Sequence, residues 1–464
     1  MRQNRDIDAK GQQRRQAMGL DPIWRLILRF SGPAVISMTV ASSYQLVDAI
    51  FVGRLGTGSL AAMSVTYPLV LSFVAIGSGT GTGVTSLISR TLGAGDSKGA
   101  DKVSGVAISL CFLISGIIAL FCLPNLDTIL RTLGASGSVL PLANKYTSIL
   151  IQFRIFSYLS MIMSSLIRAD GNPVFSSIVA ISSSVINIAL DPILIFGLGP
   201  IPAMGISGAA IATVIAQGIS TIVYIIFIIK GRTAYHFRPS NFWPSLTIIA
   251  GIYRVGVASI VRSAAQFVVM GVVNRTAVSF GITPLAIMGA LVRIGRFVLM
   301  PCLGLGQGML PLIGYNYGAS KKDRLSEIIF KAGTIGVIWT SLCWMLIMLF
   351  PEQVISAFNA EADFLNEGAK ALRLYSIMYF ALGIQMVPGF FFQGIGKGLP
   401  STVLSAARQV VFILPSILLL PRFLGLTGLW ISYPIADALG LMLGVGWMAI
   451  ELRKQKISLL LRKS

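Results

Sequence analysis

Charged residues are scarce in this chain, and acidic residues are the scarcest of them. Only 12% of the 464 residues are charged, with 17 Asp and Glu against 37 Lys and Arg, whereas ordinary soluble domains are about 25% charged. Hydrophobic residues make up 55% of the chain, and its mean hydropathy is +0.80. A soluble fold of this size cannot bury so much apolar surface, so the composition predicts a polytopic helical membrane protein.

Histidine and cysteine are equally rare. The single histidine, His236, lies in a basic loop, so a histidine-rich metal site is excluded. No two cysteines form a CxxC pair, and all lie in or next to apolar runs, so we interpret them as small buried hydrophobes: Cys111, Cys122, Cys302 and Cys343. An intramembrane enzyme needs a nucleophile–base pair or a metal site. The sequence offers neither, and we expect no enzymatic activity.

About twelve apolar runs are long enough to cross a bilayer, at roughly 20 residues each. They are continuous, unlike the short alternating segments of a membrane β-barrel. The chain is therefore predicted to be an all-α membrane protein. The runs cover residues 27–52, 60–91, 103–123, 139–166, 174–196, 207–229, 247–279, 284–314, 330–350, 370–392, 401–420 and 428–451.

The positive charges gather in alternate connections between these runs. With the N-terminus inside, eleven Lys and Arg fall in the inside connections 90–102, 168–173, 230–244, 315–327 and 394–400, against Arg54, Arg131 and Arg422 in the outside connections. The positive-inside rule then places both termini in the cytoplasm of a multi-pass protein of the cell membrane. This orientation and anionic lipid headgroups account for the net charge of +20, so no nucleic-acid partner is expected.

An internal repeat divides the chain into two halves. Segment 79–98 resembles 302–321, segment 168–171 resembles 393–396, and segment 205–209 resembles 425–429. Three matches in order at nearly one offset predict two six-helix lobes in the same orientation, a parallel repeat about an axis along the membrane normal. The expected organisation is a basic leader (1–22), an N-lobe (23–229), a cytoplasmic linker (230–246), a C-lobe (247–451) and a basic tail (452–464).

Polar side chains from three helices of the N-lobe fall at one depth. Asp48 is the only carboxylate of the first apolar run, and Tyr44 lies one turn below it. Asn187 and Asp191 are four residues apart and share a face of the fifth helix, and Thr213 lies at a similar depth in the sixth. A charge at membrane depth is a functional-site hypothesis by default. The matched depth favours one site for a proton or a hard cation such as Na⁺.

Each of these residues also has an ordinary interpretation. Asp48 can be solvated at the end of its helix, and Asp191, which precedes Pro192, can cap a helix end. Asn187 and Thr213 can form interhelical hydrogen bonds.

Two other features bear on mechanism. Pro33 lies inside the first predicted helix, where it removes a hydrogen bond and produces either a static kink or a bend coupled to the charge on Asp48.

The C-lobe has no counterpart of the two carboxylates but carries arginines in or near apolar runs: Arg262, Arg275, Arg293, Arg296 and Arg408. Snorkelling to the interface explains some of them. Arg293 and Arg296 are three residues apart and share one helix face. If they line a cavity, their positive charges favour anionic or zwitterionic substrates.

These motifs resemble the multidrug and toxic compound extrusion (MATE) transporters, especially their DinF-like and MepA-like branches. The resemblance covers nearly the whole chain after the leader. The segments that carry it are 44–48 with 52–53 and 60–62, then 92–96, 168–173, 187–192 and 205–210.

The resemblance implies a twelve-helix, two-lobed, V-shaped antiporter that exports cationic or amphipathic drugs in exchange for H⁺ or Na⁺, with no further cofactor. It also implies roles for individual residues. Asp48 matches the coupling residue, and the other first-lobe positions match the cation site or its neighbour: Asn187, Asp191, Thr213 and Tyr44. Pro33 matches the bending proline of the family.

We expect the partners to be drug-like small molecules and the bilayer, and we expect a monomer. The alternative function is flipping of a lipid-linked oligosaccharide or another lipid by the related two-lobe fold, which the C-lobe arginines favour. A passive channel fits less well with two unlike lobes.

Overall fold

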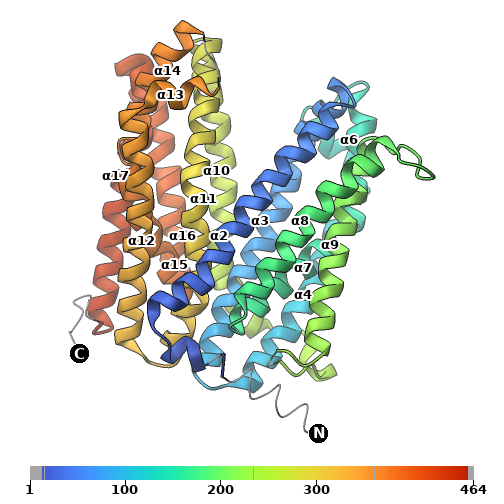
Figure 1. Cartoon of the computed structure of the whole chain (residues 1–464), viewed down its shortest axis with the longest axis vertical. Helices are drawn as coiled ribbons and strands as arrows, with labels where there is room; N and C mark the ends of the chain where they lie inside the picture. Colours follow the sequence, from blue (N-terminus) through green and yellow to red (C-terminus); the bar gives the residue numbers. More distant parts are fainter. Residues whose placement is uncertain (1–12, 15, 234, 359–360, 458–464) are drawn as a thin grey trace. The chain divides into compact units, whose positions relative to one another are not determined.

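The structure is helical throughout, as the sequence predicts. The computed structural model describes residues 13–14, 16–233, 235–358 and 361–457 (Figure 1). Within this part of the chain, the only β-type pairing is an isolated bridge between Leu198 and Ile201. The expectation of an all-α membrane protein is confirmed.

The chain forms two compact units. The first contains Ile36–Gly256 and the described residues before Asp21, and the second contains Asp21–Val35 and the described residues from Val257 on. Both boundaries fall inside helices, namely α2 (Ile23–Gly53) and α10 (Leu246–Ser279). Each of these two helices therefore begins in one unit and ends in the other.

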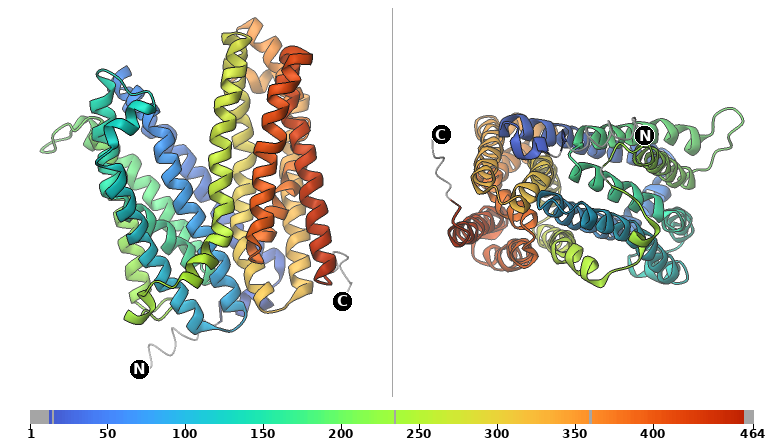
Figure 2. Two further views of the ribbon diagram at one scale, coloured as in Figure 1. Left: turned by 180° about the vertical axis from the view of Figure 1, so that it is seen from behind. Right: turned by 90° about the horizontal axis from the view of Figure 1, so that it is seen from below.

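The long helices of the first unit lie side by side (Figures 1 and 2). Helix α9 packs against α6, α7 and α8, and α3 packs against α4, α6 and α7. Besides its parts of α2 and α10, the unit holds α3 (Thr57–Gly93), α4 (Ser97–Cys122), α5 (Leu126–Thr132), α6 (Val139–Gln152), α7 (Arg154–Ala169), α8 (Pro173–Phe196), α9 (Ile206–Ile229) and the 3-10 helix η1 (Pro239–Phe242).

The second unit is also a helical bundle, in which α11 packs against α12 and α15. A π-helix, η3, interrupts its C-terminal part. Besides parts of α2 and α10, the unit holds α11 (Ile282–Gly318), α12 (Lys322–Leu349), α13 (Pro351–Ser356), α14 (Ala362–Tyr375), the 3-10 helix η2 (Tyr379–Ala381), α15 (Leu382–Gly394), α16 (Gly398–Ala406), η3 (Ala407–Ile413) and α17 (Leu414–Lys454).

The number of spans agrees with the expectation of about twelve. In the described chain, nine helical stretches are long and apolar enough to cross a membrane, and two bent pairs bring the number to eleven. One of the nine, Gly398–Lys454, runs over 57 residues and is broken inside α17 by Gly425, where φ is 56°. At 1.5 Å per residue this stretch is long enough for two spans.

The sequence did not predict the two bends. The fourth span, expected as one helix over 139–166, consists of α6 and α7, which meet at 49° around Phe153. The tenth consists of α14 and the segment Tyr379–Gly394, which meet at 41°. At the first bend, Phe153 has non-helical dihedral angles, with φ −103° and ψ 16°, and separates the two helices.

Glycines of the repeated segments allow another helix to approach closely in each unit. On α3, a Cβ added at Gly83 would lie 2.1 Å from the carbonyl oxygen of Ile252 in α10. On α11, a Cβ added at Gly304 would lie 2.7 Å from the Cα of Val35 in α2. Close packing through small residues is typical of membrane helices. Glycines of both segments therefore allow close packing, Gly83 against the first part of α10 and Gly304 against the first part of α2.

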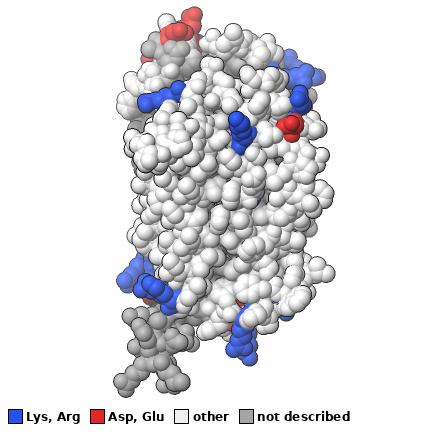
Figure 3. All heavy atoms as spheres, turned by 90° about the vertical axis from the view of Figure 1, so that its right-hand side faces the viewer, with Lys and Arg blue, Asp and Glu red and all other residues white. Residues whose placement is uncertain are grey.

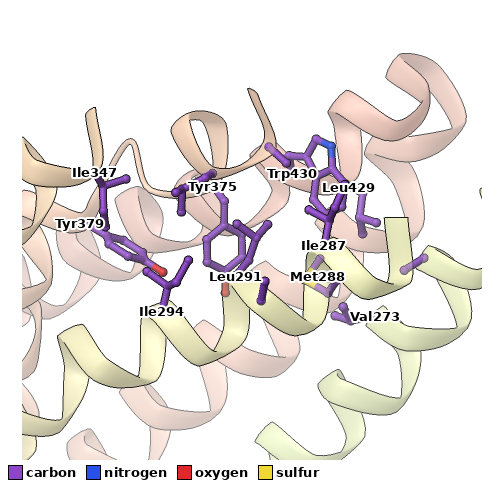
Figure 4. Packing of buried hydrophobic residues seen from close by; sticks show 14 of the residues in the cluster. Val273, Ile287, Met288, Leu291, Ile294, Ile347, Tyr375, Tyr379, Leu429 and Trp430 are labelled. Carbon is purple, nitrogen blue, oxygen red and sulfur yellow. The ribbon is translucent and has the colours of Figure 1, made fainter. Parts of the chain in front are cut away.

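A cluster of buried apolar and aromatic residues forms the core of the second unit. Tyr375, Tyr379, Leu291 and Trp430 belong to it and come from α14, η2, α11 and α17 (Figure 4). The rings of Tyr375 and Tyr379 meet edge to face with 6.0 Å between centroids. This cluster joins the bent span α14–η2–α15 to the helices around it.

Large apolar side chains also cover outward faces of the helices. Examples are Leu120 and Phe121 on α4 and Ile229 on α9, which are 69%, 64% and 78% exposed. On the face seen in Figure 3, Lys and Arg lie toward the two ends, and the middle is free of charge. Such a surface suits lipid chains in the middle and headgroups at the ends.

The basic connections of the first unit meet at one end. Arg14 donates from Nη2 to the carbonyl of Arg232 at 3.1 Å, and the amide of His236 donates to Oδ1 of Asp101 at 2.8 Å. The hydroxyl of Tyr235 donates to the carbonyl of Leu166 at 2.7 Å. The three connections that the charge pattern assigns to one side therefore share one end of the unit.

Candidate ion-coupling site

Two carboxylates are buried inside the first unit. Asp48, on the part of α2 that belongs to this unit, is 5% exposed, and Asp191 on α8 is fully buried. They lie close enough to interact electrostatically. The structure thus brings together the two carboxylates that the sequence places at one depth.

Both carboxylates have oxygen atoms without a partner. Among the described residues, no hydrogen bond reaches Oδ1 of Asp48 or either oxygen of Asp191, and all three atoms are buried. Buried polar atoms of native proteins are almost always hydrogen-bonded, so each exception calls for a ligand, a proton or an ion. Neither a solvated helix end at Asp48 nor a helix cap at Asp191 agrees with this burial.

An amide and a hydroxyl lie on neighbouring helices. Asn187, one turn before Asp191 on α8, donates from Nδ2 to Oγ1 of Thr213 on α9 at 3.3 Å. An interhelical hydrogen bond of this kind was the alternative to an ion site for these two residues. It uses only the amide nitrogen of Asn187, however, and not the amide oxygen. The Oδ1 atom of Asn187 is buried without a partner in the described chain, which adds a fourth orphan oxygen.

Two tyrosines lie within electrostatic range of both carboxylates. Tyr44, predicted from the sequence, lies on α2 one turn before Asp48. Tyr146 on α6 is buried and was not predicted. Its only signal in the sequence is a run of polar residues, Asn144 to Ser148, within an otherwise apolar span.

A buried arginine near the bend of the fourth span was also not predicted from the sequence. Arg154 begins α7, directly after the bend, and is 5% exposed. Its guanidinium lies 4.9 Å from the ring centre of Phe73, and its Nη1 reaches Oγ of Ser157 at 3.5 Å. Its Nε and Nη2 have no hydrogen-bond partner in the described chain. It forms no salt bridge with either carboxylate there, so the two acidic charges are left without a fixed counter-cation.

The arrangement can hold a cation or a proton. Carboxylate, amide and hydroxyl oxygens are the ligands that hard cations prefer. Two carboxylates close together in a water-poor interior cannot both stay ionised without a compensating charge. The residues present therefore fit either coupling ion, Na⁺ or H⁺.

Both carboxylates buried in the described part of the second unit have a basic partner, and Oε1 of Glu451 lies 2.7 Å from Nζ of Lys397. Asp437 on α17 is 3% exposed, and its Oδ1 accepts hydrogen bonds from Nε and Nη2 of Arg408, at 2.8 and 2.7 Å. The sequence offered no account of Arg408, and the structure shows that it neutralises Asp437.

The remaining predicted residues lie elsewhere. Pro33 is inside α2, which remains one continuous helix, and lies in the part that belongs to the second unit, whereas Asp48 lies in the part that belongs to the first. Arg293 and Arg296 are exposed on α11. The arginines that line a cavity of the second unit are Arg262 and Arg408.

Comparison with known proteins gives consistent matches over most of the chain. A family model described as MatE matches residues 33–193 and 255–418. Two curated proteins named multidrug export protein MepA are similar. The one from Staphylococcus haemolyticus (strain JCSC1435) is 29% identical over 423 residues, covering 89% of this chain and 91% of that protein. The one from Staphylococcus aureus (strain MSSA476) is 28% identical over 426 residues, covering 90% and 92%.

A solved structure is similar along nearly its whole length. It is described as the outward-facing conformation of a multidrug resistance MATE family transporter of the MOP superfamily. It superposes with a TM-score of 0.89 at 28% identity, covering 96% of this chain and 98% of that one.

Proposed function

Because the chain belongs to the MatE family, the multidrug and toxic compound extrusion transporters, we propose that it exports organic cations and amphipathic compounds in exchange for H⁺ or Na⁺. The coupling ion binds in the first unit, at Asp48 and Asp191. Asn187, Thr213 and Tyr44 supply further oxygens around it, and transport proceeds by alternating access.

The observation that carries this proposal is the set of orphan oxygens. Four buried oxygen atoms of Asp48, Asp191 and Asn187 have no hydrogen-bond partner in the described chain. Leaving buried polar atoms unpaired costs about 1–3 kcal/mol each, and more for charged groups. An entering H⁺ or Na⁺ removes that cost, which gives the site its affinity for the ion.

Exchange follows from the charge of the site. An organic cation bound near the ionised carboxylates is stabilised by them, and the coupling ion competes for the same charge. Ion entry from outside neutralises the pair, weakens the hold on the substrate and releases it outward. Loss of the ion to the inside then restores the charged site.

The test is transport by the purified protein in proteoliposomes, with H⁺ and Na⁺ gradients imposed separately and a fluorescent lipophilic cation as the probe. We expect one of the two gradients to drive transport. Asp48→Asn should abolish the effect, and Asp127→Asn should retain it because Asp127 lies on α5 outside the site, exposed and bonded to Asn144 at 2.5 Å. Transport that ignores both gradients would refute the proposal.

We also propose that both termini are cytoplasmic, because the basic connections then lie inside. Ser240, in η1 of the 230–244 connection, is exposed. A Ser240→Cys variant should react with impermeant thiol reagents only from the inside. Labelling from outside in intact cells would show that the orientation is the opposite of the one proposed.

The alternative function is lipid flipping, which the arginine-lined cavity of the second unit favours. The same proteoliposomes distinguish the two functions. A flippase would move a labelled lipid headgroup between leaflets without responding to Asp48→Asn.

A further inference from the structure

A half-open cavity lies within the second unit. Its volume is about 110 Å³, and its walls come from α10, α11, α15, α16, η3 and α17. Drug-sized ligands occupy pockets of about 300–1,000 Å³. This cavity therefore accommodates a headgroup with a few attached carbons, not a whole drug.

The cavity carries a positive charge. Arg262 and Arg408 both line it, but Arg408 is neutralised by Asp437 at 2.7 Å. Arg262 makes no side-chain hydrogen bond or ion pair with any described residue. The guanidinium stays charged at any physiological pH, so the cavity holds one unneutralised cation.

Neutral polar groups extend this charged wall. Ser405, Arg408 and Gln409 line the cavity together, and their spacing of three and four residues places them on neighbouring positions of the helix surface. The side chains of Ser405 and Gln409 make no hydrogen bond with the described residues. The π-helix η3 carries Arg408 and Gln409, and π-helical insertions are frequent at functional sites.

Other residues that line the cavity are apolar. Leu299, Met386 and Phe390 face the same cavity. A charged group within a membrane-spanning bundle is costly unless it meets a counter-charge. A guanidinium with hydroxyl and amide donors beside it suits planar or tetrahedral oxyanions, which it binds through two parallel hydrogen bonds.

We propose that this cavity binds the oxyanion headgroup of an amphipathic anion, a carboxylate or a phosphate monoester, with Arg262 as the charged ligand. The first carbons of its chain contact Leu299, Met386 and Phe390. The second unit thus carries an anion site, in contrast to the cation site proposed for the first.

At one position of the cavity wall, a larger side chain can fill the cavity without strain. Gly389 on α15 lines the cavity, and a Cβ added there would meet nothing within 4 Å. Replacing a glycine inside a helix by a good helix former also raises helix propensity. Gly389→Leu is therefore expected to fold and to occlude the cavity while Arg262 stays in place.

The experiment is equilibrium binding of radiolabelled dodecanoate to the full chain in phosphatidylcholine nanodiscs, with dodecyl phosphate, dodecanol and dodecyltrimethylammonium as competitors. We expect saturable binding of dodecanoate and displacement by dodecyl phosphate. The relative affinities of these two ligands identify the preferred headgroup. Dodecanol and dodecyltrimethylammonium should compete at least about tenfold more weakly, since they lack the charge-assisted hydrogen bonds.

Three variants locate the ligand. Arg262→Gln and Gly389→Leu should each weaken dodecanoate binding by at least about tenfold. Arg275→Gln should bind as the wild type does, because Arg275 lies on the same helix but is exposed and outside the cavity.

Wild-type affinity in Gly389→Leu, or in a folded Arg262→Gln, would overturn the proposal, as would equal competition by dodecanol. If Arg262→Gln does not fold, Gly389→Leu alone decides. Binding is measured without a gradient, so the result is independent of whether the protein is an ion-coupled exporter.

Discussion

The buried carboxylates Asp48 and Asp191 of the first unit differ from Asp437 of the second in whether a basic side chain neutralises them. In the first unit, Asp48 and Asp191 have three oxygens without a hydrogen-bond partner in the described chain. In the second, Asp437 is held by two guanidinium nitrogens of Arg408, at 2.7 and 2.8 Å. Burial alone therefore does not identify a coupling residue, since Asp437 is as buried as Asp48.

The difference lies in what neutralises each charge. A fixed guanidinium makes the Asp437 charge permanent and structural, because arginine does not release its proton. The first unit offers Asp48 and Asp191 no such partner, and Arg154 lies against Phe73 instead. We therefore propose that an exchangeable ion supplies the counter-charge of Asp48 and Asp191. The counter-charge of Asp437 is Arg408.

The largest expected effect comes from breaking the Arg408–Asp437 pair. Arg408→Met leaves a buried carboxylate uncompensated, which costs about 3–5 kcal/mol. The thermal midpoint of the purified protein should fall markedly. The double variant Arg408→Met/Asp437→Leu should recover most of the loss, because it removes both charges. If the double variant is as unstable as the single one, the pair does not neutralise Asp437.

A smaller effect is expected for Tyr146→Phe. Its hydroxyl lies in the field of both carboxylates, and removing a polar group of this kind costs about 1 kcal/mol, or roughly fivefold in ion affinity. The gradient dependence of export should shift toward higher ion concentration.

The matched control for this variant is Tyr158→Phe. Tyr158 donates to the carbonyl of Phe73 at 3.1 Å, so its loss should lower stability and leave the ion dependence unchanged. An equal shift of the ion dependence in both variants would show that Tyr146 does not contribute to the ion site.

The smallest effect on stability is expected for Pro33→Ala. Alanine restores the helical N–H that proline lacks, so the thermal midpoint should not fall. Export should slow several-fold, because Pro33 lies in α2 close to the point where the helix passes from one unit to the other. Turnover equal to that of the wild type would leave only a static role for this proline.

Much of the fold could be predicted from the sequence because apolar run length is set by bilayer thickness. The fifth span was expected over 174–196 and is Pro173–Phe196, and the sixth was expected over 207–229 and is Ile206–Ile229. The bend at Phe153 could not be predicted, because no proline or glycine marks it. It depends on packing within the unit.

The candidate site was only partly predictable. Depth along a helix follows from residue number, so the sequence could place Asp48 and Asp191 at one level. Which way a side chain points around its helix axis depends on tertiary packing, and this is why Tyr146 and Arg154 were missed. The pairing of Arg408 with Asp437 spans 29 residues and two helical segments, and no local pattern reports it.

The measurement that tests the central claim most directly is gradient-driven export by Asp48→Asn, Asp191→Asn and the double variant, with Asp437→Asn as the control. If Asp48 and Asp191 form one ion-binding unit, each single variant abolishes export, and the double is no worse than the worse single, because removing either member disables the site. Asp437→Asn keeps ion-driven export in the folded protein. Near-normal export by Asp48→Asn, or loss of coupling in folded Asp437→Asn, would contradict the account.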